Sequence, residues 1–282
     1  MKTLFFGTSA FAVPSLEIVA ARTALAGVVT QPDRPAGRGH RLKPSAVKSA
    51  ALELGLPVHE PMGLIALAQA SAQEQFDLFV LASYGRILPK QLLALPRLGA
   101  LNVHPSLLPK YRGATPIQAA IASGEKETGV SIMLMDPGLD TGDLVLARRV
   151  AIGPEETYGE LHDRLAWIGA ELLAQAIDLA AEGELPRRPQ QGDASMTRPI
   201  SKEELTIDWS WPPQRIVDMV RAYSPQPAAR AMLDGESVKI LRAHIASDGA
   251  LVIDELIAPN RGKMSGQEYR RIRRRGANPE PG

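Results

Sequence analysis

The stretch Lys2-Thr-Leu-Phe-Phe-Gly7 decides the fold that we expect for this chain of 282 residues. Its apolar side chains follow one another without alternation and stop at Gly7, which is typical of a buried strand. Pro14 then opens a helical pattern that lasts to Ala21, as proline often does in a first helical turn. A buried strand that leads into a helix predicts a βα unit, the building block of a parallel sheet.

The alternation of strands and helices continues beyond this first unit. Further strands are predicted at 25–30, 77–82, 100–103, 129–135 and 144–150, and further helices at 44–54 and 157–182. We therefore expect the α/β class, with a doubly wound, mainly parallel sheet of the Rossmann-like kind. The first turn, Gly7-Thr-Ser-Ala10, lacks the later glycines of the dinucleotide fingerprint, and the chain has no Walker A pattern. The sheet is consequently not expected to bind NAD or ATP.

The composition changes at residues 184–200, where Pro, Gly, Gln and Arg replace the apolar periodicity. This change predicts a catalytic domain at 1–183, a linker at 184–200 and a second domain at 201–282. Beyond the linker the pattern predicts a helix at 213–222 and strands at 228–233, 238–246 and 250–257. The second domain is therefore expected to be small and rich in β-structure.

The bulk composition excludes several classes of protein. A net charge of +1 gives no global signal for a nucleic-acid partner, so such a signal must come from local patches. The absence of cysteine excludes disulfides, thiolate metal sites and a cysteine nucleophile, and it fits a reducing cytoplasm. No apolar stretch approaches the roughly 18 residues of a membrane span. We expect a cytoplasmic protein with no membrane partner.

The polar residues of greatest interest end the strand predicted at 100–103. The segment reads Asn102-Val-His-Pro-Ser-Leu-Leu-Pro-Lys-Tyr-Arg-Gly113, so Asn102 and His104 stand two positions apart and can share one face of the strand. A side-chain amide can donate to a developing oxyanion, and an imidazole can move a proton near neutral pH. The pair is thus suited to acyl transfer.

A second segment, Asp136-Pro-Gly-Leu-Asp-Thr-Gly-Asp143, forms a predicted tight loop with carboxylates at Asp136, Asp140 and Asp143. A carboxylate near His104 would orient the ring and stabilise its charged form. Taken singly, each of these features also fits an ordinary structural role: a histidine at a strand end, an asparagine cap and an aspartate in a turn. The residues alone leave both interpretations open.

Together the two segments resemble the signature of the formyltransferases that use 10-formyltetrahydrofolate. Both motifs, N-x-H-P-S-L-L-P and D-x-G-L-D-T-G, occur in full and in order. The resemblance implies that Asn102, His104 and Asp140 are catalytic, that the folate is the formyl donor and that no metal is needed. It also implies folate contacts by the segment after His104 and by the loop Ser83–Pro89, namely Ser106, Leu107, Leu108, Pro109, Tyr84, Gly85 and Ile87.

Within the family, the chain most resembles members whose acceptor is an aminoacylated initiator tRNA. The segments that carry this likeness are 30–39, 44–48, 113–118, 201–204 and 207–210, and it runs through most of residues 1–245. It implies that the α-amino group of methionyl initiator tRNA is formylated for translation initiation. It also implies an OB-like C-terminal domain that binds tRNA, and a monomer is expected.

Two basic segments are candidates for contact with RNA. Residues 31–50 hold five basic side chains against one acid, a net +4, and the implied tRNA contacts among them are Arg34, Arg38, Arg41 and Lys43. Prolines and glycines in this loop predict an irregular backbone. The arginines of residues 270–275 form the second segment, which fits either RNA binding or a disordered, solubilising end. A solvated surface loop is the alternative for the first segment.

The chain departs from the family pattern near its C-terminus. Gln226 stands where the family usually has Trp, and the part after Ala246 is short, with Asp248-Gly249 as a direct turn. We therefore expect an abbreviated or partly open barrel. The main alternative function is a sugar-nucleotide N-formyltransferase with the same donor. A glycinamide ribonucleotide formyltransferase and a non-catalytic folate- or RNA-binding protein fit less well, because the first turn lacks a Gly-Ser-Asn sequence and all three polar residues are present.

Overall fold

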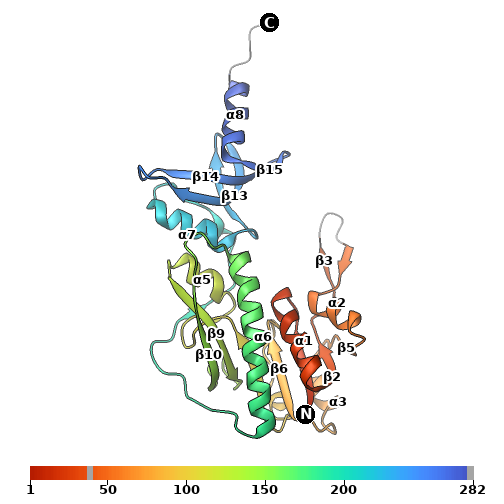
Figure 1. Ribbon diagram of the computed structural model, residues 1–282. Helices are drawn as coiled ribbons and strands as arrows, with labels where there is room; N and C mark the ends of the chain where they lie inside the picture. The colour runs from red at the N-terminus through yellow and green to blue at the C-terminus, as the bar shows by residue number, and fades with distance from the viewer. Residues whose placement is uncertain (37–40, 278–282) are drawn as a thin grey trace. The chain divides into compact units, whose positions relative to one another are not determined.

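The structure is a computed structural model that describes residues 1–36 and 41–277 (Figure 1). The chain divides into two compact units, each built from several segments. The first unit comprises residues 1–114, 128–150 and 163–197, and the second comprises 115–127, 151–162 and 198–282. The boundaries predicted at 184 and 200 follow sequence order alone and stay a prediction.

A seven-stranded sheet forms the centre of the first unit, in the order β10-β9-β7-β6-β1-β2-β5. Its strands are β1 (Lys2–Gly7), β2 (Ala24–Val29), β5 (Val58–His59), β6 (Leu78–Ala82), β7 (Ala100–His104), β9 (Glu127–Leu134) and β10 (Leu144–Ala151). The five strands from β7 to β5 are parallel to their neighbours, whereas β9 runs antiparallel to β7. The predicted doubly wound, mainly parallel sheet is thereby confirmed.

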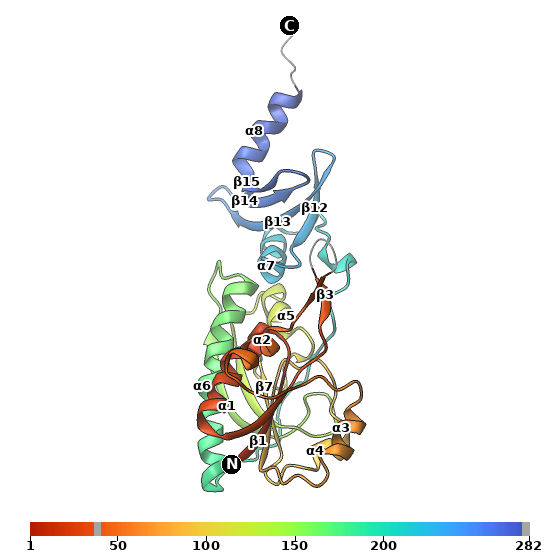
Figure 2. The same cartoon turned by 90° about the vertical axis from the view of Figure 1, so that its right-hand side faces the viewer.

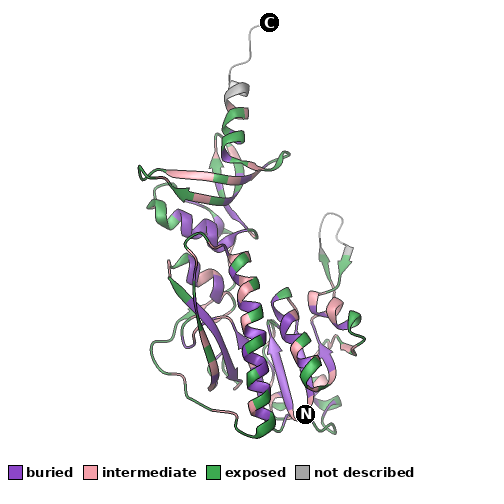
Figure 3. Ribbon diagram, viewed as in Figure 1, coloured by how far each residue is buried: buried purple, intermediate pink, exposed green. Residues whose placement is uncertain are grey.

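Helices cover both faces of this sheet. They are η1 (Ala10–Ala12), α1 (Val13–Arg22), α2 (Ala46–Glu53), α3 (Leu64–Ala70), α4 (Lys90–Leu93) and α6 (Tyr158–Glu182). Figure 2 shows α1 and α6 on one side of the sheet and α3 and α4 on the other. Figure 3 shows the central strands of this sheet mostly buried, whereas buried and exposed residues alternate along α6.

Close packing fixes the strand that carries the polar pair. A Cβ on Gly169 of α6 would lie 2.8 Å from Cγ1 of Val103, so the glycine allows the helix to approach β7 directly. On the neighbouring strands, the rings of Phe6 and Phe79 pack with their centroids 5.2 Å apart, and both side chains are fully buried. Because the interior is close-packed, the neighbouring side chains restrict the position of β7 and, with it, the positions of Asn102 and His104.

The second unit contains a four-stranded antiparallel sheet in the order β12-β13-β14-β15. Its elements are α5 (Pro116–Ala122), η2 (Glu203–Leu205), α7 (Pro213–Tyr223), β12 (Ala229–Leu233), β13 (Glu236–Ile245), β14 (Leu251–Ala258), β15 (Gly262–Ser265) and α8 (Gly266–Ala277). The predicted small β-rich domain is confirmed. Asp248 and Gly249 turn directly between β13 and β14, with Gly249 at φ +84°. Over the described part of the chain, this sheet is open and not a closed barrel.

The segment after β14 forms a strand and a helix as far as residue 277, which decides against a disordered end over these residues, whereas RNA binding there stays a prediction. Strand β15 and helix α8 were not predicted, and α8 is anchored by Tyr269, which is 2% exposed and donates its hydroxyl hydrogen to the carbonyl of Leu233 at 3.0 Å. Arg273 pairs with Glu236 at 2.9 Å. An amphipathic helix with one buried aromatic anchor holds its place even where most of its side chains are charged. Residues 278–282 lie outside the described part.

Two small paired segments complete the first unit. β3 (Arg34–Ala36) and β4 (Arg41–Lys43) form an antiparallel hairpin, so the backbone predicted as irregular is regular on both arms. β8 (Arg112–Gly113) and β11 (Met196–Thr197) pair in parallel. The segment predicted as a linker is therefore not a free connection, because some of its residues form main-chain hydrogen bonds with the first unit.

Candidate active site

Strand β7 presents Asn102 and His104 on the same face, as the spacing of two residues predicts. His104 is 4% exposed, and Asn102 is half-buried. Both residues lie between β6 and β9 in the middle of the sheet, so main-chain hydrogen bonds on either side fix their Cα positions. Their rigidity comes from the fold and not from a loop.

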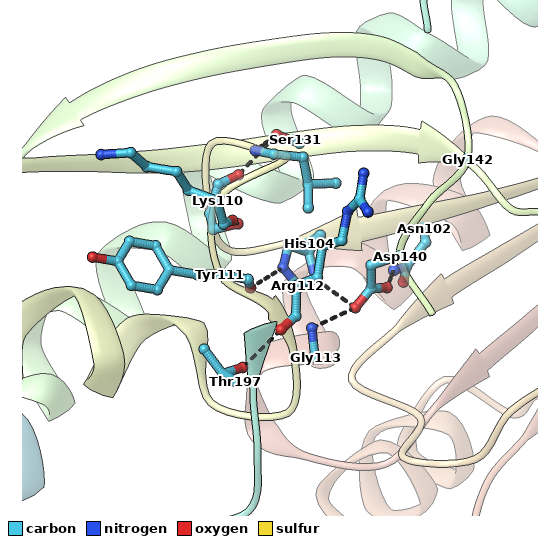
Figure 4. A network of polar contacts seen from close by, with 12 residues as sticks. Asn102, His104, Lys110, Tyr111, Arg112, Gly113, Ser131, Asp140, Gly142 and Thr197 are labelled. Atoms are coloured by element: carbon cyan, nitrogen blue, oxygen red, sulfur yellow. Dashed lines mark hydrogen bonds and ion pairs between the residues drawn. The ribbon is translucent and has the colours of Figure 1, made fainter. Parts of the chain in front are cut away.

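Asp140 lies between these two side chains, within hydrogen-bonding or ion-pair range of both (Figure 4). Its Oδ1 accepts a long hydrogen bond from Asn102 Nδ2 at 3.4 Å, and its Oδ2 is 3.6 Å from His104 Nδ1. Oδ2 also accepts a hydrogen bond of 2.8 Å from the backbone N–H of Gly113. The structure thus brings the three predicted catalytic residues together.

The path of the Asp140 loop differs from the simplest expectation for a parallel sheet. Because β9 is antiparallel to β7, with Leu134 opposite Leu101, the loop 135–143 leaves the sheet at the edge where β7 begins. It folds back across the face of β7 to place Asp140 beside Asn102 and His104. The loop therefore starts beside the amino-terminal end of β7, yet it places the Asp140 carboxylate near the carboxyl end of that strand.

Hydrogen bonding fixes the tautomer of His104. Its Nε2 is 3.0 Å from the carbonyl oxygen of Tyr111, which can only accept, so Nε2 carries the hydrogen in the neutral ring. Nδ1 then presents its lone pair toward Asp140. A proton taken up by His104 is consequently bound at Nδ1, next to a carboxylate that stabilises it.

Burial lowers the pKa of His104 below its ordinary value, since a charged imidazole is poorly solvated there. The negative charge of Asp140 and the carbonyl of Tyr111 act in the opposite direction but do not outweigh burial. The sequence motifs predict only the raising effect of a nearby carboxylate, because burial of the ring is a property of the folded chain. With a depressed pKa, the resting imidazole is neutral at pH 7 and is able to accept a proton.

Unusual backbone conformations hold the site together. Tyr111 and Asp140 adopt positive φ angles of +59° and +53°, which cost side-chain-bearing residues free energy, of order 1–3 kcal/mol each. Gly113 has φ +105°, and a Cβ there would lie 2.3 Å from the carbonyl oxygen of Thr197. A Cβ on Gly142 would lie 1.7 Å from the carbonyl oxygen of Leu134. Only glycine fits these two positions.

The predicted donor-binding segment 106–109 is mostly buried within its own loop. Ser106 is fully buried, and its hydroxyl donates to the carbonyl of Lys110 at 2.6 Å. The side chain of Leu107 packs against Gly129, where an added Cβ would lie 2.5 Å from Leu107 Cδ2. Leu108 and Pro109 are buried. The segment therefore has a clear structural task, and its contact with folate stays a prediction.

The loop that follows β6 leaves the same edge of the sheet as the segment after His104, since β6 and β7 are parallel neighbours. The ring of Tyr84 is buried against Phe6, and its carbonyl accepts hydrogen bonds from Thr8 Oγ1 and Gln31 Nε2. Ile87 is 70% exposed, and Gly85 is exposed at φ +77°. Of the three predicted donor contacts here, Gly85 and Ile87 are open to a ligand, whereas the Tyr84 side chain belongs to the core.

The predicted tRNA contacts lie on the hairpin. Arg34 and Lys43 are exposed and face each other in the register of β3 and β4. Arg41 begins β4, and Arg38 lies outside the described residues. At the base of the hairpin, Lys48 Nζ donates to Asp33 and Glu60, each at 2.8 Å, and these bonds raise its pKa. The arms thus extend from a fixed base.

Residues from the predicted linker complete the network around the site. Gln190 contacts Arg112 and the Asp140 loop, the Ser195 hydroxyl accepts from the N–H of Tyr111, and the Thr197 hydroxyl donates to the carbonyl of Arg112. Sequence reasoning missed all three, because a segment without apolar periodicity gives no local signal of where it packs.

Neither a metal centre nor a membrane span is found over residues 1–36 and 41–277. Within those ranges no group of three or more His, Cys, Asp or Glu side chains could hold a metal ion. No helix described there combines the length and the apolar character needed to cross a bilayer.

Comparison with known proteins identifies the family. Residues 1–177 match the family described as formyl transferase, and residues 199–252 match the formyl transferase C-terminal domain. The chain belongs to the formyltransferase family. The expected family is thereby confirmed, and the family match covers the three polar residues described above.

Several relatives carry one name. A methionyl-tRNA formyltransferase of Pelotomaculum thermopropionicum is 45% identical over 88% of this chain and 80% of its own length. One of Xanthomonas axonopodis pv. citri is 47% identical over 85% of this chain and 80% of its own.

Solved structures share the fold at lower identity. An N-formyltransferase of Helicobacter canadensis, in complex with folinic acid and dTDP-3-aminofucose, has a TM-score of 0.68 at 20% identity, over 87% of this chain and 88% of its own. A methionyl-tRNA formyltransferase from Clostridium thermocellum has a TM-score of 0.61 at 15% identity, over 94% of this chain and all of its own.

Proposed function

We propose that this formyltransferase transfers the formyl group of 10-formyltetrahydrofolate to the α-amino group of methionyl initiator tRNA. The observation that carries the proposal is the convergence of Asn102, His104 and Asp140 in a chain whose relatives at 45–47% identity are methionyl-tRNA formyltransferases. The product would serve translation initiation in the cytoplasm, and we expect the enzyme to act as a monomer.

Each of the three side chains has a distinct task in this reaction. Asn102 Nδ2 carries two hydrogens, and its long bond to Asp140 engages one of them. We assign the other to the formyl oxygen, where negative charge develops as the amine adds. His104 Nδ1 would accept the amine proton, and Asp140 would stabilise the resulting imidazolium. The imidazolium would then return the proton to the donor nitrogen as the bond between that nitrogen and the formyl carbon breaks. The gap of 3.6 Å between Nδ1 and Oδ2 is expected to shorten in the complex.

The residues around the site fit a folate donor. When bound, the folate supplies an electrophilic formyl carbon. Gly85 and Ile87 offer an exposed backbone and an exposed apolar side chain on the loop that follows β6, which suits an aromatic heterocycle. The Ser131 hydroxyl holds the adjoining segment 106–109 in place. It donates to the carbonyl of Ser106 at 2.7 Å and accepts from the N–H of Leu108.

The direct test is a formylation assay with the purified chain and 10-formyltetrahydrofolate. Methionyl initiator tRNA is expected to be formylated, whereas uncharged initiator tRNA and methionyl elongator tRNA serve as controls. An amino-sugar nucleotide tests the alternative acceptor class, because the Helicobacter canadensis neighbour was solved with such a compound. Formylation of the sugar nucleotide without formylation of the tRNA would overturn the proposal.

A further inference from the structure

Gln190 joins the two loops that meet at Asp140. Its Nε2 donates to the carbonyl of Asp140 at 2.9 Å and to the carbonyl of Gly142 at 2.8 Å. Its Oε1 accepts from Arg112 Nε at 3.1 Å and from Arg112 Nη2 at 2.7 Å. Carbonyls only accept and a guanidinium only donates, so these partners fix the orientation of the amide.

The four bonds use the full hydrogen-bonding capacity of the amide, which has two N–H donors and an oxygen with two lone pairs. A glutamate at position 190 would lose both donors. A methionine, whose side chain has a similar length, would lose all four hydrogen bonds. No other side chain of this length offers two donors and an acceptor in one plane. The position is therefore specific for glutamine in a way that a surface linker does not require.

The bonds act on the parts of the site that hold its geometry. The carbonyl that Gln190 binds belongs to Asp140 itself, whose backbone has φ +53°. Arg112 lies between Tyr111, which accepts from His104 Nε2, and Gly113, whose N–H donates to Asp140 Oδ2. Gln190 thus ties the segment that orients His104 to the loop that carries Asp140.

We infer that Gln190 is a positioning residue that sets the placement of Asp140 against His104 and Asn102. This inference rests on the proposed function, since those three residues do the chemistry there. Gln190 does not itself reach the reacting atoms; it acts through the Asp140 backbone. Its removal should let the loop 135–143 move away from the face of β7 and so weaken the electrostatic support of His104.

The test compares Gln190→Met, which is neutral and of similar length, with Gln191→Met at the exposed neighbouring position. We expect Gln190→Met to lose about 10²-fold in kcat, the typical cost of misplacing a catalytic group by about 1 Å. Gln191→Met should match the natural chain. Gln190→Glu keeps an acceptor for Arg112 but loses both donors, and we expect a similar loss of kcat.

A pH profile separates positioning from general stability. With Asp140 displaced, the pKa of His104 should fall, so the acid limb of kcat/KM should move to lower pH in Gln190→Met. The charged and titratable groups around His104 are Asp140, Arg112, Lys110 and Tyr111, and the side chains of the last two point away from the ring (Figure 4). A loss of kcat with an unmoved acid limb, or unchanged kcat in both Gln190 variants, would overturn the inference.

A second readout does not depend on activity. The N–H of Gly113 donates to Asp140 Oδ2 at 2.8 Å, so its hydrogen exchange, followed by NMR, reports whether the carboxylate is in place. We expect faster exchange in Gln190→Met and no change in Gln191→Met. If the natural chain formylates no acceptor, the proposed function fails, while this exchange rate still decides the role of Gln190. Unchanged exchange in Gln190→Met would count against it.

Discussion

At the scale of single residues, the site depends on a buried histidine that stays neutral. His104 is held by the carbonyl of Tyr111 on one side and faces Asp140 on the other. Burial wins over the attraction of the carboxylate, so the low pKa of the ring leaves it ready to take a proton at neutral pH. The amide of Asn102 needs no such adjustment, because it donates at every pH at which the protein is folded.

Removing either group should slow the chemical step while leaving the fold intact. We expect Asn102→Ala and His104→Ala each to lose at least about 10²-fold in kcat, the usual cost of one oxyanion donor or one general base. Single-turnover kinetics with methionyl-tRNA measure this, and circular dichroism checks folding. Near-natural turnover in either variant would contradict the roles assigned here.

The depressed pKa of His104 also makes stability depend on pH. The unfolded chain binds a proton at this ring near pH 6.5, whereas the lowered pKa means that the folded chain binds it only at lower pH, so stability is lost as pH falls below 6.5. In the pH window just below 6.5, the slope from this one residue reaches at most about 1.4 kcal/mol per pH unit. We expect urea unfolding of His104→Asn to show a shallower dependence in this window. Equal slopes would indicate that the ring titrates normally.

At the scale of elements, the β3–β4 hairpin carries exposed positive charge on both of its arms. Its base is fixed by the ion pairs of Lys48 with Asp33 and Glu60, whereas the side chains of Arg34 and Lys43 on its arms are exposed. A fixed base with exposed cationic arms suits a phosphate backbone better than a fully mobile loop would, because less conformational freedom is lost on binding.

Charge removal on the hairpin should weaken the use of tRNA and not the binding of the donor. We expect Arg34→Ala with Lys43→Ala to raise KM for methionyl-tRNA. The slope of log affinity against log salt should also fall, by about 0.7–0.9 for each phosphate that the protein no longer neutralises. Arg97→Ala is the matched control, since Arg97 is exposed and pairs with Asp77 at the edge where β6 begins. An unchanged salt slope in the double variant would favour an ordinary surface loop.

At the scale of the whole molecule, the three residues of the candidate active site and the loops around them belong to one compact unit. The other unit has its own core, in which Tyr269 of α8 packs with residues of α7 and the four-stranded sheet. The donor chemistry and the C-terminal sheet can therefore be perturbed separately.

The variant Tyr269→Ala should separate the two. Deleting a buried aromatic ring costs about 3–5 kcal/mol, so we expect the C-terminal unit to unfold at lower temperature. Binding of folinic acid, measured by titration calorimetry, should persist, whereas formylation of methionyl-tRNA should fall. Tyr269→Phe, which keeps the ring and removes the hydroxyl with its bonds to the Leu233 carbonyl and to Glu236, is the control. Abolished folinic acid binding would show that donor binding depends on the C-terminal unit.

The sequence by itself determined the α/β class, most strand positions and the three catalytic candidates. It could do so because buried strands read as short apolar runs and because the two motifs are contiguous, so each carries its own signal. The positions of Asn102 and His104 on one face follow from strand geometry alone.

Only the tertiary structure decided how the pieces meet. The antiparallel pairing of β9, the return of the Asp140 loop across β7 and the bonds of Gln190 all join residues that are far apart in the chain. The net direction of the His104 pKa was also set at this level, because desolvation depends on everything packed around the ring. Contacts between residues so far apart leave no local trace in the order of amino acids.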